Sequence, residues 1–169
     1  MFVDTYTTIH SIISLLALAL GLIVILDFFG VRIPPAVTAL FLLLAFLTSA
    51  TGFGFPFNGL LPSHIVGALA LIFLAITVFA RYALDLRGIW RPAYVIGITA
   101  NAFFLVFVGV AQAFAKIPSL QALAPTQSEA PFAITQLIVL AIFVVIAIVS
   151  LRGYRPETVS PLGPRQMMR

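Results

Sequence analysis

Residues 132–151 read FAITQLIVLAIFVVIAIVSL, a continuous run without a single charged side chain. A helix needs about 20 mostly apolar residues to cross the hydrocarbon core of a bilayer, and this run has that length. Four other runs of similar length and character occupy residues 8–29, 35–53, 63–80 and 93–115. The sequence therefore predicts an all-α integral membrane protein with five transmembrane helices.

The composition of the whole chain agrees with a lipid environment. Of its 169 residues, 62% are hydrophobic and 8% are charged, whereas a soluble domain carries about 25% charged residues. Too little polar surface is available to cover a water-soluble globule. The length fits one domain, and we expect a five-helix transmembrane domain at residues 1–155. A cytoplasmic tail containing proline and arginine would follow at residues 156–169.

The basic residues predict how the helices are oriented. Loops on the cytoplasmic side of a membrane carry an excess of Lys and Arg. Eight of the nine basic residues fall on one side of the five spans, namely Arg32, Arg81, Arg87, Arg91, Arg152, Arg155, Arg165 and Arg169. Lys116 falls on the other side. We therefore expect the N-terminus outside, the C-terminus in the cytoplasm, and a multi-pass location in the cell (inner or plasma) membrane.

Aromatic residues and the longest connection add detail to this topology. Tyr82, Trp90 and Tyr154 lie on the cytoplasmic side of the predicted spans, where interfacial aromatic residues are common. The connection over residues 116–130 is the longest. Its apolar residues recur every third position, at Ile117, Leu120 and Leu123, which favours a short interfacial helix.

Composition and motifs exclude several function classes. The net charge of +4 could suit nucleic acid, but the arginines flank apolar runs, so we expect the lipid bilayer and no nucleic acid as a partner. The chain has no cysteine, which excludes thiolate metal sites and thiol nucleophiles. It shows no paired carboxylates, no Ser–His–Asp set and no phosphate-binding glycine loop. An enzymatic function is therefore not expected.

Polar residues recur on single faces of the predicted helices. A helix turns by about 100° per residue. In the fourth helix this rotation places a stripe of polar and small residues on one side, at Tyr94, Gly97, Asn101, Gly109 and Gln112. Small residues let helix backbones approach, and amides and hydroxyls bond across helices in lipid. Helix packing is therefore the favoured interpretation of these stripes.

The alternative interpretation is a ligand pocket. With the expected topology, most of the polar residues fall in the outer half of their helices, and Asn101 falls near the middle of the membrane. A polar pocket between helices is a common ligand site. Its candidate residues are His10, Ser14, Thr48, Ser49, His64, Asn101, Gln112 and Gln136. Such a pocket would bind or transport a small molecule, for example a small apolar ligand.

The two histidines offer a third hypothesis. His10 and His64 are expected at similar depth near the outer surface, and two neutral imidazoles on facing helices can ligate a metal ion or haem iron. No cofactor is predicted, because two histidines without a diagnostic spacing do not form a motif. Haem b, in an electron-transfer protein ligated by His10 and His64, is the alternative to simple interfacial histidines.

Asp27 is the one carboxylate near a predicted membrane span, at the inner end of the first helix. An intramembrane carboxylate is a candidate for a proton relay. An interfacial position beside Arg32, or an ion pair with another loop arginine, is favoured over that role.

The chain is similar in length and number of spans to the five-helix tryptophan-rich translocator proteins, which bind porphyrins and sterols. It has one tryptophan, Trp90, and no residue carries over from that family. The sequence thus favours a multi-pass membrane protein without a catalytic motif, acting as an oligomerising or accessory subunit of a membrane complex. Ligand binding or transport and haem-based electron transfer are the alternatives.

Overall fold

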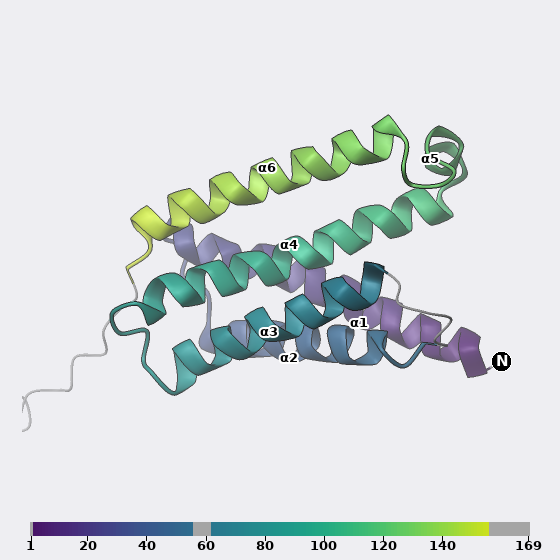
Figure 1. The fold of residues 1–169 in the computed structure, drawn as a ribbon. Coiled ribbons are helices and arrows are strands. Elements are labelled where there is room, and N and C mark those ends of the chain that lie inside the picture. The colour runs from purple at the N-terminus through teal and green to yellow at the C-terminus, as the bar shows by residue number, and fades with distance from the viewer. Residues whose placement is uncertain (1, 56–61, 156–169) are drawn as a thin grey trace, which may run out of the picture.

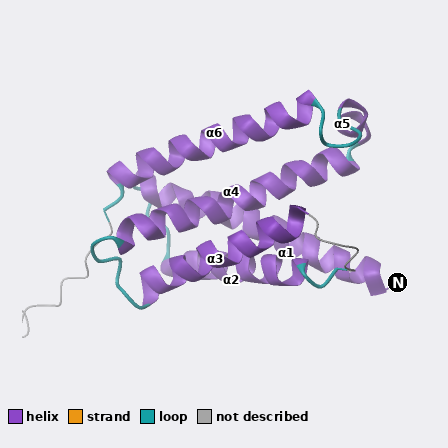
Figure 2. Ribbon diagram, in the orientation of Figure 1, coloured by secondary structure: helices purple, strands orange, loops and turns teal. Residues whose placement is uncertain are grey.

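The structure, a computed structural model, describes residues 2–55 and 62–155; the expected tail at 156–169 lies outside these ranges. All regular elements in the described part are helical (Figure 2). They are α1 (Phe2–Ile25), the 3-10 turn η1 (Leu26–Phe29), α2 (Pro35–Gly52), α3 (Pro62–Tyr82), α4 (Trp90–Lys116), α5 (Pro118–Leu123) and α6 (Ala130–Gly153). Five of them are long and apolar enough to cross a membrane, which confirms a membrane-embedded, multi-pass helical bundle.

The helix boundaries follow local sequence signals. Pro35 and Pro131 lie in the first turns of α2 and α6, where the missing N–H of proline would have had no partner in the helix. Pro92 likewise lies in the first turn of α4, so this helix begins at Trp90, three residues earlier than predicted. The short helix expected in the longest connection is present as α5.

Gly30 ends the first helical segment. Its φ of +88° is left-handed, a conformation that glycine adopts without the steric cost that other residues meet. Its amide donates to the Asp27 carbonyl at 3.2 Å. The chain thereby leaves the end of η1 and turns back into α2.

The five long helices run alternately up and down (Figure 1). We call the end where α1 begins the N end and the end where α6 finishes the C end. The N end also holds α5 and the start of α3, and the C end holds η1 and the turn from α3 to α4. All described arginines lie toward the C end, and Lys116 lies toward the N end. Charge is thus segregated as the sequence suggested.

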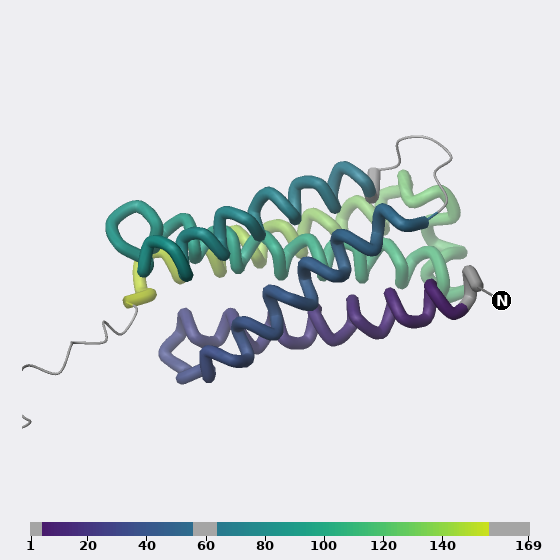
Figure 3. The backbone as a smooth tube through the Cα atoms, turned by 90° about the horizontal axis from the view of Figure 1, so that it is seen from below, coloured from purple at the N-terminus to yellow at the C-terminus, as the bar shows by residue number. Residues whose placement is uncertain are grey.

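Helix α4 lies at the centre of the bundle and contacts α1, α3, α5 and α6. Helix α2 crosses obliquely between α1 and α3 (Figure 3). Helix α6 packs on α4 along its length and touches η1. Buried residues make up 44% of the most apolar stretch of α4 but 11% of that of α6, so α6 leaves most of its surface uncovered by the described chain.

Small residues set the closest helix approaches. A Cβ atom added at Gly97 of α4 would lie 1.9 Å from the Thr77 hydroxyl and 3.2 Å from the Phe73 carbonyl oxygen, both on α3. At Gly21 of α1, a Cβ atom would lie 2.8 Å from the Phe41 ring of α2. The crossings of α4 with α3 and of α1 with α2 therefore depend on the absence of a side chain at these positions.

Candidate functional site

His10 joins α1 to α2 near the N end. Its Nδ1 lies 2.8 Å from the Thr51 hydroxyl, and the Tyr6 hydroxyl donates to the Thr51 carbonyl. The Thr51 hydroxyl also donates its one hydrogen to the Leu47 carbonyl at 2.6 Å. It therefore accepts from Nδ1–H of His10, and in the neutral form of the ring Nε2 is then the acceptor atom. A neutral imidazole with a free Nε2 lone pair is the form that binds metals.

Phenylalanines of the segment after α2 pack against both histidines. Phe55 meets His10 edge to face with ring centroids 5.1 Å apart, and it meets Tyr6 in the same way at 5.0 Å. Phe53 packs against His64, with ring centroids 5.7 Å apart. Both histidines thus lie at the N end, as expected, and each has a different phenylalanine beside it. Whether they share a ligand stays a hypothesis.

The remaining candidate pocket residues are spread over the bundle. The Ser14 hydroxyl donates to the His10 carbonyl at 2.7 Å, so these two candidates are joined within α1. Thr48 and Ser49 are half-buried in α2. Gln112 is exposed in the last turns of α4, toward the N end of the bundle. The sequence placed Gln112 on the same stripe as Asn101. Gln112 is nevertheless exposed, because neighbouring helices cover the middle of α4 but not this face near its last turns.

The two buried amides bond to helix backbones. The Asn101 amide donates to the Gly97 carbonyl of its own helix at 2.9 Å. The Gln136 amide of α6 donates to the Phe107 carbonyl of α4 at 3.0 Å. Within the described residues, the Gln136 Oε1 and Thr48 Oγ1 atoms are buried without a hydrogen-bond partner. These contacts support the packing interpretation for Asn101 and Gln136, because their donors serve the helices themselves.

The fourth-helix stripe is buried at Tyr94, Gly97 and Asn101, as its periodicity suggested. Thr99 is also buried, although the sequence placed it on another face. The reason is that α4 has neighbours on several sides, so a single buried face does not describe it.

A second polar cluster, not identified from the sequence, lies at the C end. We call it the C-end cluster; it consists of Asp27, Arg81, Tyr94 and Tyr154. Arg81 of α3 donates to the Tyr94 hydroxyl of α4 at 3.1 Å, and its guanidinium carbon lies 5.4 Å from the centre of the Tyr94 ring. Tyr94 is fully buried. Tyr154, beyond α6, lies close enough to Asp27 and Arg81 for both charges to act on its pKa.

Aromatic packing and one further arginine hold this cluster. The Tyr154 ring packs on Phe28 with centroids 4.8 Å apart. Arg91 donates to the carbonyl oxygens of Tyr154 at 2.6 Å and of Leu151 at 3.4 Å. It thereby caps the end of α6, where helix carbonyls lack partners. Tyr154, expected among the interfacial aromatic residues of the inner side, is 7% exposed, because these contacts fold it back onto the bundle.

Burial raises the pKa of Tyr154 to about 12, and the negative charge of Asp27 acts in the same direction. The phenol therefore stays protonated throughout the physiological pH range. A proton relay needs groups that exchange protons near neutral pH. We therefore interpret the cluster as a structural contact that joins η1, α3, α4 and the segment after α6.

The sequence contained part of the signal for the C-end cluster. Asp27 was singled out as a carboxylate near a span, with a loop arginine as its expected neighbour, and Tyr94 belonged to the polar stripe. Arg81 and Tyr154 meet these residues because of the way α3 and α6 pack around α4. No local sequence pattern encodes this packing.

We expect replacement of Asn101 by leucine to lower thermal stability only slightly. The lost bond returns to the helix's own backbone, and such bonds in membrane bundles contribute about 0.6 kcal/mol on average. The midpoint of thermal aggregation in detergent measures the change. Gln112→Leu removes the same amide from an exposed site and serves as the control. A strong loss of a co-purified small molecule in Asn101→Leu alone would instead favour the pocket hypothesis.

Comparison of the chain with protein family models, with curated proteins and with solved structures gave no match.

Proposed function

We propose that this protein is a non-catalytic, multi-pass subunit of the cell membrane that associates with copies of itself or with other subunits. The observation that carries the proposal is α6. This helix is apolar on all sides, a property of helices that are surrounded by protein or lipid. Its large exposed side chains are Ile134, Leu137, Ile138, Leu140, Ile142, Val144, Val145, Ile148 and Val149.

The position of α6 in the bundle supports a role in association. It packs on α4 with one side and turns its other sides away from the bundle (Figure 1). Bonds from Gln136 and from Arg91 hold its two ends to α4. A helix fixed in this way presents a rigid apolar surface on which a second membrane helix can pack.

The absence of cysteine from the chain permits a direct test of association. We expect Val145→Cys, at a position 59% exposed on α6, to form disulfide-linked dimers in native membranes or to be cross-linked to another subunit. Ile72→Cys, 56% exposed on α3, is the control and should form fewer adducts. Native mass spectrometry of the detergent-purified protein measures the assembly directly.

Two outcomes of the association experiment would contradict the proposal. A monomer that keeps a small molecule in native mass spectrometry would favour ligand binding or transport. A redox-sensitive Soret band in the visible spectrum, lost in His10→Ala and in His64→Ala, would favour the haem hypothesis.

The proposed orientation, with the N-terminus outside and the C-terminus in the cytoplasm, has a separate test. We expect a cysteine at Gln121, exposed on α5, to react in intact cells with a membrane-impermeant reagent. A cysteine at Ile89, 75% exposed in the turn before α4, should react only after the cells are opened. Ile89 is preferred to its neighbour Gly88, whose φ of +55° would strain a cysteine. Labelling of Ile89→Cys in intact cells would reverse the orientation.

A further inference from the structure

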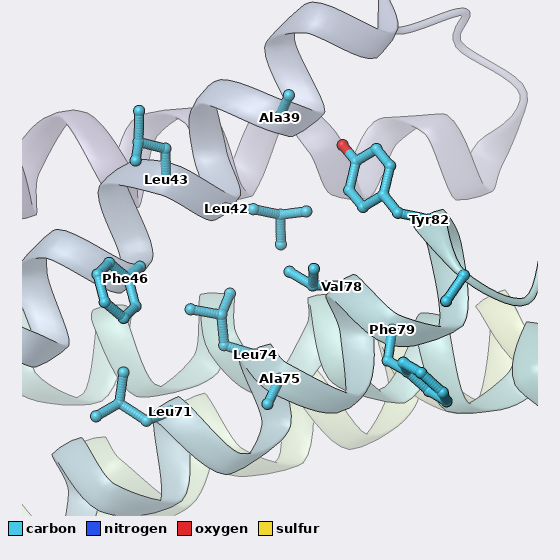
Figure 4. Close-up of a pocket in the computed structure, with 11 residues that line it drawn as sticks. Ala39, Leu42, Leu43, Phe46, Leu71, Leu74, Ala75, Val78, Phe79 and Tyr82 are labelled. Carbon is cyan, nitrogen blue, oxygen red and sulfur yellow. The ribbon is translucent and has the colours of Figure 1, made fainter.

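An apolar groove runs along the surface between α2 and α3 (Figure 4). Its volume is about 910 Å³, within the range of about 300–1,000 Å³ that small-molecule sites occupy. Leu42 of α2 and Leu74 and Val78 of α3 point toward one another in its middle. Phe46 closes it toward the N end, and Tyr82 lies at the C end. The hydroxyl of Tyr82 is the single polar side-chain atom among the lining residues.

The groove faces outward in the membrane-spanning part of the bundle. Four of its lining side chains are 47–57% exposed, namely Leu43, Phe46, Phe79 and Tyr82. Both α2 and α3 are long and apolar enough to cross a membrane. A surface of this kind is in contact with lipid chains or with another protein, because water is excluded from the hydrocarbon core.

Two exposed arginines belong to the segments at the C end of the groove, and one of them, Arg87, pairs with Asp85 at 3.7 Å. Arg32 precedes the start of α2 by three residues, and Arg87 follows the end of α3 by five. Both are exposed, and these two helix ends flank the opening at which Tyr82 lies. A molecule that fits this surface therefore has a long apolar part and an anionic group at one end.

We propose that the groove binds one acyl chain of an anionic phospholipid, with the phosphate at the end marked by Arg32, Arg87 and the Tyr82 hydroxyl. Basic residues beside a membrane surface attract anionic headgroups. A thin, flexible chain also suits the walls better than a second copy of the protein does. A straight helix of a second copy would meet the projecting rings of Phe46, Phe79 and Tyr82, whereas an acyl chain can bend around them. The site is independent of the association proposed for α6.

The single tryptophan of the chain is a natural reporter for this site. The Trp90 ring packs against Phe79, a wall residue, with ring centroids 5.6 Å apart. Bromine atoms on an acyl chain quench tryptophan fluorescence only at short range. The purified protein is placed in bilayers of phosphatidylcholine that contain either brominated phosphatidylglycerol or brominated phosphatidylcholine. We expect half-maximal quenching at about a fivefold to thirtyfold lower fraction of the anionic lipid, as attraction to one or to both arginines would give at about 1 kcal/mol each.

Variants separate the groove from the headgroup site. Ala75→Phe, which fills the groove from α3, should reduce quenching by both lipids, and Ala39→Phe provides an independent filling variant from α2. Ala141→Phe on the exposed side of α6 is the control and should leave quenching unchanged. Arg32→Gln and Arg87→Gln should remove the preference for the anionic lipid, whereas Arg152→Gln at the end of α6 should preserve it.

Equal quenching by the two lipids in the unaltered protein would overturn the proposal, as would quenching that neither filling variant reduces. Weak quenching by both lipids, with dissociation of a dimer in the filling variants, would show that a second copy occupies the groove. Cross-linking through α6 is measured separately, so failure of the lipid site and failure of the proposed association give different results.

Discussion

Replacement of Gly97 by alanine is expected to lower the thermal stability of the protein markedly. The new methyl group would lie 1.9 Å from the Thr77 hydroxyl and 3.1 Å from its Cβ atom. Thr77 is fully buried and donates to the Phe73 carbonyl at 2.6 Å, so its side chain has little room to move. Forcing an extra carbon into a packed interface costs about 1–3 kcal/mol. The midpoint of thermal aggregation, followed by size-exclusion chromatography in detergent, measures the loss.

Gly153→Ala is the matched control for Gly97→Ala. A Cβ atom at Gly153 would meet nothing within 4 Å, so this variant should be as stable as the unaltered protein or slightly more stable, since alanine favours a helix by about 0.5–1 kcal/mol. The double variant Thr77→Ala with Gly97→Ala removes the closest atom and should recover part of the stability. The Phe73 carbonyl, 3.2 Å away, would still limit the recovery. Equal midpoints for the two single glycine variants would mean that α3 and α4 are not in close contact here.

Replacement of Arg81 by methionine is the second change for which we expect a large loss of stability. Arg81 donates to the fully buried Tyr94 hydroxyl at 3.1 Å. Methionine keeps much of the apolar stem but provides no donor. A buried hydroxyl left without its partner costs about 1–3 kcal/mol. The same thermal measurement in detergent should show a clear decrease in the midpoint.

Arg87→Met is the control for the loss of charge, because the Arg87 side chain is 85% exposed at the same end of the bundle and pairs with Asp85 at 3.7 Å. We expect almost no change there, since exposed ion pairs contribute little. In the double variant Arg81→Met with Tyr94→Phe, both partners of the bond are absent. Its loss should be smaller than the sum of the two single losses. Additive losses would indicate that the two side chains act independently.

The candidate site could be predicted only in part. The periodicity of α4 correctly placed Tyr94 and Asn101 on a buried face, because a polar group in lipid has to meet protein. Periodicity does not predict which neighbouring helix each of these side chains contacts. Asn101 bonds to its own backbone, and Gln136 reaches the backbone of α4. The pocket hypothesis assumed that these residues converge, and convergence depends on helix rotation and neighbour choice.

The sequence by itself determined the number of membrane helices, their approximate ends and the segregation of basic residues. These properties follow from local physics, because the length of an apolar run decides whether it can span a membrane and proline marks the first turn of a helix. The central position of α4, the contact of Gly97 with Thr77 and the C-end cluster were decided by the tertiary structure. Each of these features joins residues of different helices, and nearly all lipid-facing surfaces are equally apolar. Which helices become neighbours is therefore set by the fit of particular side chains, a property of the assembled bundle.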